Sequence, residues 1–192
     1  GALLVGVSFA KALAYVKKLP LIGVNHIEGH ITAILLEEEI KFPYLGLIVS
    51  GGHTSLYIVN GIGSYQHLGS TRDDAAGEAL DKAGKLLGLG YPAGAIIDRI
   101  AKEGDPKAIK FPRANIQDLP YDFSFSGVKT FLVNLVHKEG KSFAEKNLNA
   151  IAAGYLEAVV DMLVDKTVKA ARENMLNTIV MAGGVAANSR LR

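Results

Sequence analysis

The chain has 192 residues, enough for one medium domain or two small lobes, and its 49% hydrophobic and 21% charged residues argue against a disordered protein. The 21 basic and 19 acidic side chains leave a net charge of +2, which neither requires nor excludes a nucleic-acid partner. Cysteine is absent, which excludes disulfide bonds and thiolate metal sites and fits a cytoplasmic protein.

The two ends of the chain predict that it is an internal part of a larger protein. The chain starts at Gly1 inside an apolar helical pattern and stops at Arg192 without a cap or a turn cluster. No apolar run reaches the roughly 18 residues of a membrane span, and no signal-peptide pattern opens the chain. We therefore expect no contact with a membrane.

Predicted helices and strands alternate along the chain. Helices are expected at residues 1–18, 26–39, 73–87, 92–102, 126–138 and 142–174, the last as one helix or as a broken pair. Strands are expected at residues 21–24, 44–50, 54–60, 65–70 and 178–182, and a further helix is expected to begin near Ala186. Strands followed by helices indicate an α/β layered fold.

Two histidines in the second predicted helix, His26 and His30, are spaced four residues apart. At about 100° per residue they lie only about 40° apart around the helix, so both imidazoles can reach one metal ion. Glu28 lies about 200° from His26, on the opposite side of the helix, which argues against the His-Glu-x-x-His site of zinc proteases. The spacing is equally compatible with two surface histidines that bind no metal.

Two glycine turns follow predicted strands. Ser50–Thr54 (SGGHT) lets backbone N–H groups approach a phosphate closely, although a plain hairpin has the same pattern. Ala182–Asn188 (AGGVAAN) resembles the strand–helix turns that cradle nucleotides, although a tight turn without a ligand also fits. Its glycine spacing does not support a dinucleotide site of the Gly-x-Gly-x-x-Gly type.

Acidic residues mark the next predicted helix. Asp74, Glu78 and Asp81 fall at positions i, i+4 and i+7, so three carboxylates share one stripe. Water, a cation or ligand hydroxyls would relieve their repulsion, and a solvated acidic face is the simplest interpretation. Downstream, Ser126–Thr130 (SGVKT) lacks the adjacent Gly-Lys pair and the upstream glycine of a P-loop, which excludes that site.

Taken together and in order, five stretches resemble the universal tRNA threonylcarbamoyltransferase family, formerly described as glycoproteases. The stretches are Asn25–His30, Val49–Thr54, Asp73–Glu78, Phe123–Thr130 and Met181–Asn188. The resemblance covers essentially the whole chain. It implies the two-lobed actin-like ATPase fold, built on ribonuclease-H-like sheets. This partial chain would then supply the end of the first lobe with the metal-binding helix (residues 1–41) and a second lobe that is incomplete at its C-terminus (residues 42–192).

The resemblance also implies an activity and a set of site residues. Members of the family work with partner subunits on tRNA and use threonylcarbamoyl-AMP as the donor. They transfer its threonylcarbamoyl group to the exocyclic amine of the adenosine 3′ of the anticodon, in tRNAs that read codons beginning with A. By position, His26 and His30 match two ligands of one divalent metal, iron or alternatively zinc, and an Asp beyond Arg192 would be the third. The matching substrate-binding positions are Ile48, Val49, Ser50, Gly51, Gly52, Asp81, Gly94, Asp98 and Asn188. No catalytic base is assigned.

Two other functions fit parts of the pattern. A sugar or acetate kinase of the same fold would share both glycine turns but has no use for His26 and His30. A non-catalytic paralogue that acts as an assembly partner would typically lack these histidines, which this chain has. The histidine pair therefore favours the transferase over both alternatives.

Overall fold

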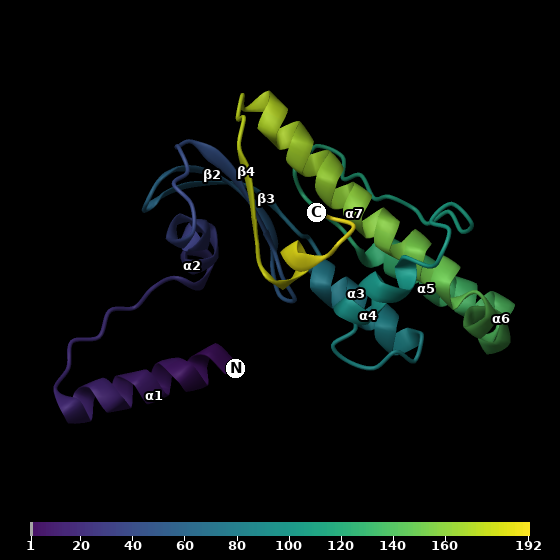
Figure 1. Cartoon of the computed structure of the whole chain (residues 1–192), viewed down its shortest axis with the longest axis horizontal. Helices are drawn as coiled ribbons and strands as arrows, with labels where there is room; N and C mark the ends of the chain where they lie inside the picture. The colour runs from purple at the N-terminus through teal and green to yellow at the C-terminus, as the bar shows by residue number, and fades with distance from the viewer. Residues whose placement is uncertain (1) are drawn as a thin grey trace.

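The computed structural model describes residues 2–192, with only the backbone of Ala2, as a four-stranded sheet flanked by helices (Figure 1). The strands are β1 (Tyr44–Val49), β2 (Thr54–Gly61), β3 (Ser64–Ser70) and β4 (Ile179–Ala182). The helices are α1 (Ala2–Lys17), α2 (His26–Thr32), α3 (Ala76–Leu86), α4 (Gly94–Ala101), α5 (Ser126–Glu139), α6 (Lys141–Lys146) and α7 (Leu148–Glu173). Two short 3-10 turns complete the set, η1 (Ala33–Leu36) and η2 (Gly184–Ala187).

The sheet has the strand order β3-β2-β1-β4. Strands β1, β2 and β3 are successive antiparallel neighbours, as short hairpin connections require. Strand β4 pairs parallel to β1. A parallel partner needs a crossover connection, and helices α3 to α7 supply it. The α/β layered fold expected from the sequence is confirmed.

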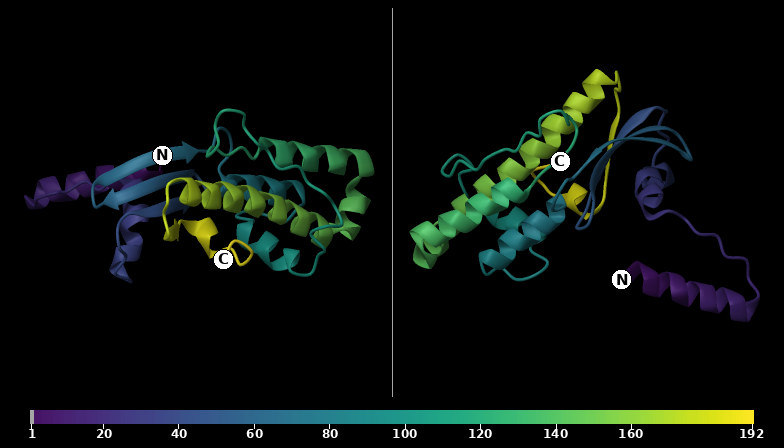
Figure 2. Two further views of the ribbon diagram at one scale, coloured as in Figure 1. Left: turned by 90° about the horizontal axis from the view of Figure 1, so that it is seen from above. Right: turned by 180° about the vertical axis from the view of Figure 1, so that it is seen from behind.

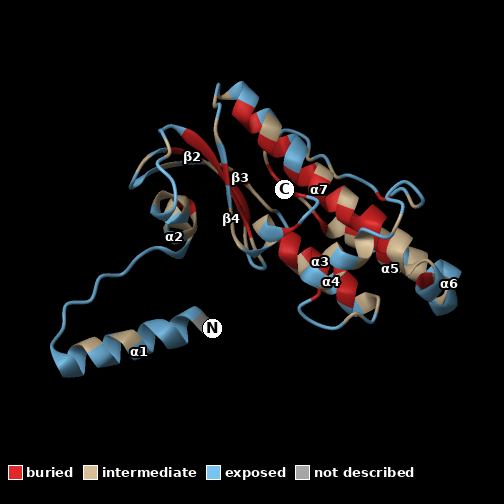
Figure 3. Cartoon of the chain, in the orientation of Figure 1, coloured by how far each residue is buried: buried red, intermediate tan, exposed pale blue. Residues whose placement is uncertain are grey.

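Strand β1 is buried on both of its faces, which explains why its sequence is apolar without alternation (Figure 3). On one face, Leu45 and Leu47 pack into the large core made with α3, α5 and α7. On the other face, Tyr44 and Ile48 pack with Ile31 of α2, and the Tyr44 hydroxyl donates a 2.9 Å hydrogen bond to the Ile31 carbonyl. The sheet therefore separates α2 from the larger helical layer.

Helix α1 stands apart from the sheet, and an extended segment joins it to α2 (Figures 1 and 2). Its apolar side chains are exposed, with Phe9 at 70% and Tyr15 at 87%. The prediction of a strand at residues 21–24 is wrong. Among the described residues, this apolar segment pairs with no strand of the sheet. Among the described residues, no helix combines the length and the apolar character that crossing a membrane requires.

Other predicted boundaries are corrected at the element ends. Helix α2 stops at Thr32 and continues only as the η1 turn, whereas a helix to residue 39 was expected. The 142–174 segment is a broken pair, divided between α6 and α7 at Asn147. After β4 the chain forms the single η2 turn, and the helix expected near Ala186 is absent from the described residues.

Candidate functional site

The histidine pair lies at the start of α2. Asn25 caps this helix, because its side-chain oxygen accepts hydrogen bonds from the backbone N–H groups of Ile27 (2.9 Å) and Glu28 (3.3 Å). The cap begins the helix at His26, so His30 follows one turn later on the same face. The Nε2 atoms of the two imidazoles lie 2.9 Å apart, close enough for one ring to donate a hydrogen bond to the other. The convergence that the spacing predicts is therefore present.

Glu28 takes no part in this convergence. Its carboxylate accepts a 2.8 Å hydrogen bond from the hydroxyl of Tyr65, a residue of β3. The Tyr65 hydroxyl in turn accepts the backbone N–H of Gly63 at 2.9 Å. Glu28 thus anchors α2 to the sheet, and the geometry agrees with the argument against a zinc-protease site.

A third imidazole, that of His53, lies beside the pair. Its ring packs edge-on against His26, with ring centroids 5.4 Å apart and an interplanar angle of 76°. Burial lowers the pKa of His30 below its ordinary value, and the neighbouring His26 and His53 lower it further. A lowered pKa favours the neutral imidazole, which is the form that binds metals. Across residues 2–192, no three His, Asp or Glu side chains are arranged to hold a metal ion.

The β1–β2 hairpin carries the first glycine turn. The backbone N–H of Ser50 donates to the His53 carbonyl at 2.8 Å, and the Ser50 hydroxyl accepts the N–H groups of His53 (3.1 Å) and Gly52 (3.4 Å). This network closes the turn with Gly51 and Gly52 exposed at its tip. The turn is therefore fixed by its own serine, and its two glycine residues face solvent.

Two further glycines bring other elements against this turn. A Cβ on Gly77, in the first turn of α3, would lie 2.7 Å from the Ser50 carbonyl oxygen and 2.8 Å from the Gly51 Cα. Gly183 has a φ of +103°, and a Cβ there would collide with the Val49 carbonyl oxygen. Both positions require glycine, so α3 and the second glycine turn pack directly on the end of β1.

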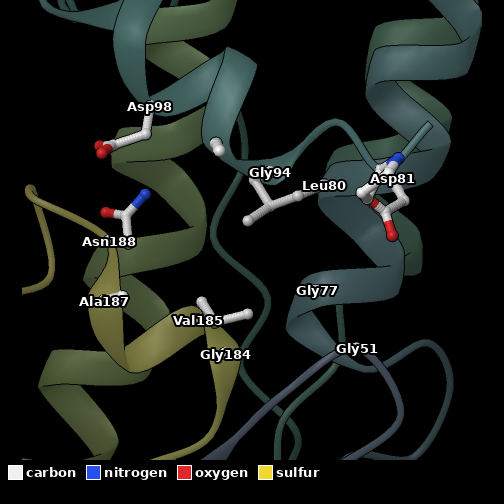
Figure 4. A pocket seen from close by; sticks show the side chains of 12 residues that line it. Gly51, Gly77, Leu80, Asp81, Gly94, Asp98, Gly184, Val185, Ala187 and Asn188 are labelled. Atoms are coloured by element: carbon white, nitrogen blue, oxygen red, sulfur yellow. The ribbon is translucent and has the colours of Figure 1, made fainter. Parts of the chain in front are cut away.

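A cavity of about 400 Å³ lies between these elements (Figure 4). Its wall is made by the hairpin tip, α3, the start of α4 and the η2 turn. The lining residues are Gly51, Gly77, Leu80, Asp81, Pro92, Gly94, Ala95, Asp98, Gly184, Val185, Ala187 and Asn188. Five of the nine substrate-binding residues expected from the resemblance are among them, although they come from four separate segments. A volume of this size suits a small-molecule ligand.

Two carboxylates and one amide give the cavity its polar groups (Figure 4). Asp81 lies on one side and accepts the backbone N–H of Ala93 at 2.7 Å. Asp98 and Asn188 lie on the opposite side (Figure 4), and Asp98 accepts a 2.8 Å hydrogen bond from the Ser189 hydroxyl. The Asn188 side-chain oxygen accepts the backbone N–H groups of Arg190 (3.0 Å) and Leu191 (3.1 Å). These contacts hold the three side chains in place before any ligand binds.

The other four expected substrate-binding residues do not line this cavity. Ile48 and Val49 are buried in β1, where they support the hairpin from within the core. Ser50 closes the turn through its hydroxyl, and Gly52 lies at the exposed tip. Their backbone or packing therefore shapes the hairpin, and only its tip at Gly51 reaches the cavity wall.

The prediction that Asp74, Glu78 and Asp81 share one helix face is wrong for Asp74. Helix α3 begins at Ala76, so Asp74 lies before the helix. The Asp74 carboxylate accepts hydrogen bonds from Lys82 (2.5 Å) and Lys129 (2.7 Å). Burial alone would raise the pKa of Asp74, but the hydrogen bonds from these lysines outweigh it and hold the pKa below its ordinary value. Asp74 is therefore a structural clasp between α3 and α5.

The arrangement as a whole suits a ligand with two chemically different ends. The cavity offers carboxylates for hydroxyl groups and a glycine tip for a phosphate. The histidine pair offers two converging imidazoles on the other side of the hairpin, next to His53. The hairpin is the wall that both places share.

Comparison with known proteins identifies relatives over the full chain. A family model described as tRNA N6-adenosine threonylcarbamoyltransferase matches residues 1–192. A protein of that name from Syntrophus aciditrophicus (strain SB) is 57% identical over 193 residues, covering 100% of this chain and 56% of the relative. One from Anaeromyxobacter dehalogenans (strain 2CP-1 / ATCC BAA-258) is 58% identical over 197 residues, covering 100% and 58%. The chain thus spans a little over half the length of these curated relatives.

Among solved structures, component A of (R)-2-hydroxyglutaryl-CoA dehydratase from Acidaminococcus fermentans has a similar fold. The TM-score is 0.50 at 17% sequence identity, covering 84% of this chain and 53% of that one. The likeness concerns the fold alone, and it confirms the actin-like ATPase fold expected from the sequence.

Proposed function

Because the chain belongs to the tRNA N6-adenosine threonylcarbamoyltransferase family, we propose that it carries the donor-binding part of such an enzyme. The whole protein transfers the threonylcarbamoyl group of threonylcarbamoyl-AMP to the exocyclic amine of the adenosine 3′ of the anticodon, in tRNAs that read codons beginning with A. The observation that carries the proposal is that one hairpin joins a nucleotide-sized cavity to a converging histidine pair. An adenylate donor with a reactive acyl end needs both.

The cavity holds the AMP part of the donor. Asp81 and Asp98 accept hydroxyl groups of the ribose, and Asn188 contacts the nucleoside from the same side as Asp98. The tip at Gly51 brings the backbone to the phosphate, with no side chain in the way. This placement directs the acyl end of the donor past the hairpin and toward the histidines.

The histidine pair fits a divalent metal. Two Nε2 atoms 2.9 Å apart on one helix face are arranged as a chelating pair, and the lowered pKa of His30 favours its neutral, ligating form. His26 and His30 would hold the ion, iron or zinc, and other parts of the whole protein would complete its ligands. When bound, such an ion acts as a Lewis acid and orients oxygen groups of the substrate.

The reaction needs positioning more than it needs a protein nucleophile. The adenosine amine attacks the carbamoyl carbon of the donor, a C–N bond forms, and the bond from that carbon to the phosphate oxygen breaks. AMP leaves with the bonding electrons, and the amine loses its proton to the surrounding solvent. The backbone N–H of Gly51, at the hairpin tip that reaches the cavity, stabilises the negative charge on the departing phosphate. Holding the donor and the adenosine amine in the correct relative position supplies much of the rate enhancement.

The rest of the proposal concerns the whole protein. Its partners are tRNA and the other subunits of a threonylcarbamoylation complex, and its place is the cytoplasm. Residues 1–41 complete one lobe and residues 42–192 belong to a second. The position of α1, which stands apart from the sheet, supports this division into lobes (Figure 1). Helix α2, by contrast, packs on the sheet face formed by Tyr44 and Ile48. The histidine pair argues against a sugar or acetate kinase, which has no use for it, and against a non-catalytic paralogue, which would typically lack it.

The test is a transfer reaction with the whole protein, its partner subunits, threonylcarbamoyl-AMP and a tRNA that reads a codon beginning with A. Mass spectrometry of the digested tRNA should show threonylcarbamoyladenosine. A matched tRNA with guanosine at the position 3′ of the anticodon should remain unmodified. Unmodified adenosine in the first tRNA would refute the proposed activity.

A further inference from the structure

His53 lies between the two binding regions and belongs to neither. Residues at the start of β2 point alternately to the two faces of the sheet. The Thr54 hydroxyl accepts the backbone N–H of Ala76 at 2.9 Å, so this side chain faces α3 and the cavity side. The preceding side chain, His53, faces the other way and packs edge-on against His26. The neighbouring residues Thr54 and His53 thus direct their side chains to opposite faces of the sheet, one toward the cavity and the other toward the histidine pair.

Backbone hydrogen bonds fix the main chain of His53, from which the imidazole projects. His53 donates its N–H to the Ser50 hydroxyl at 3.1 Å and accepts the Ser50 N–H at 2.8 Å. These two bonds close the same turn that presents Gly51 and Gly52. The His53 main chain therefore has a fixed place beside the glycine tip, and its ring contacts His26.

The chemistry of the donor supplies a use for that place. Its phosphate is proposed at Gly51 and its threonyl end at the histidine pair, so the connecting acyl group passes along the hairpin. A neutral imidazole carries one N–H donor, and the acyl end offers a carbonyl oxygen and a carboxylate as acceptors. The nucleoside part is proposed in the cavity, on the face of the hairpin opposite to this side chain.

We propose that His53 is a positioning residue that hydrogen-bonds the threonylcarbamoyl end of the donor and thereby distinguishes threonylcarbamoyl-AMP from plain AMP. The inference rests on the proposed function, because it assumes that donor. It assigns His53 to the substrate and not to the metal, because the Nε2 atoms of His26 and His30 point at each other while the His53 ring packs edge-on against His26.

The experiment measures binding to the whole protein without tRNA, for a non-cleavable analogue of threonylcarbamoyl-AMP and for AMP, together with bound metal. His53→Ala should weaken the analogue about tenfold, the size expected for one hydrogen bond to a charged group. Its affinity for AMP and its metal content should equal those of the wild-type protein. His53→Gln, which keeps an N–H donor, should recover most of the lost affinity. His67→Ala on exposed β3 is the control and should change nothing.

Three results would overturn the inference. The first is an unchanged affinity of His53→Ala for the analogue. The second is an equal loss for AMP and the analogue, which would mean that the variant only disturbs the hairpin. The third is loss of metal from His53→Ala, which would make His53 a ligand. Failure of the proposed function is distinguishable, because the wild-type protein itself would then bind the analogue no better than AMP.

Discussion

The carboxylate of Asp81 serves both the fold and the cavity. One oxygen accepts the N–H of Ala93, a fully buried residue that immediately precedes α4. The same side chain lines the cavity opposite Asp98. A substitution at this position should therefore affect both stability and, by the proposed function, nucleotide binding. Two variants separate these effects.

Asp81→Ala leaves the buried N–H of Ala93 without its acceptor, so we expect the free energy of unfolding to fall by about 1–3 kcal/mol. Asp81→Asn keeps an oxygen acceptor and should lose less than half of that amount. Both variants should bind AMP more weakly, because the carboxylate that we propose as the acceptor of ribose hydroxyls is gone. Urea unfolding and AMP titration of the whole protein measure the two effects. Wild-type AMP affinity in Asp81→Asn would show that this carboxylate does not contact the nucleotide.

At this scale, sequence spacing predicted the helical histidine pair but not its third neighbour. The i, i+4 rule places His26 and His30 together without any knowledge of the fold. His53 comes from a hairpin 23 positions after His30, so only the packing of α2 on the sheet brings it to His26. Its place next to the paired glycines was the only available signal, and that signal pointed to a turn.

Among the elements, α3 meets the hairpin at a glycine. Gly77 allows the first turn of α3 to lie against the Ser50 and Gly51 backbone, where no flexible side chain can move aside. Gly77→Ala should separate α3 from the hairpin, which lowers both the free energy of unfolding and the affinity for AMP. Thermal unfolding and AMP titration test this expectation.

The matched control for Gly77→Ala is Gly127→Ala, in the first turn of α5. A Cβ at Gly127 meets nothing within 4 Å, so this helix should gain about 0.5–1 kcal/mol from the better helix former. If Gly77→Ala were as stable as Gly127→Ala and bound AMP normally, close contact between α3 and the hairpin would be irrelevant to the site.

The clasp at Asp74 predicts how the α3–α5 contact depends on pH. The pKa of Asp74 is lowered in the folded protein, so its carboxylate stabilises the fold at every pH above its unfolded value of about 3.9. That contribution shrinks as pH falls below this value and is lost once pH passes below the folded pKa. Asp74→Asn should therefore be less stable than the wild type at pH 7, and the difference should narrow below about pH 4. Urea unfolding from about pH 2.5 to about pH 7 measures the free energy of unfolding of both proteins on either side of the unfolded pKa. If the difference between the two proteins did not change with pH, Asp74 would not stabilise the α3–α5 contact through its charge.

The boundary of α3 shows why element ends were harder to predict than elements. The predicted helix extends back to Asp73, but that side chain accepts the Phe125 backbone N–H at 2.8 Å and the Ser124 hydroxyl at 2.5 Å. These partners lie about 50 residues further along the chain. Long-range hydrogen bonds thus hold Asp73 and Asp74 in a loop, and local periodicity contains no information about them.

In the whole molecule, the cavity exists only because four distant segments meet. The hairpin, α3, α4 and the η2 turn were each predicted as an element or a turn, yet periodicity could not say that Asp81, Asp98 and Asn188 would share one wall. The resemblance to a family supplied that grouping, and the fold brings five of the nine expected positions to the cavity. Helix α1, with its exposed apolar side chains, has no covering partner among the described residues.

The central claim is that the cavity and the histidine pair serve one acyl transfer. The measurement that tests it most directly is the ratio of AMP released to threonylcarbamoyladenosine formed by the whole protein with its partner subunits, threonylcarbamoyl-AMP and tRNA. We expect one AMP per modified adenosine for the wild type and for His67→Ala. For His30→Ala we expect both products to form about a hundredfold more slowly, because the metal that its imidazole helps to hold is lost. Full modification by His30→Ala, or AMP release without modified adenosine in the wild type, would contradict it.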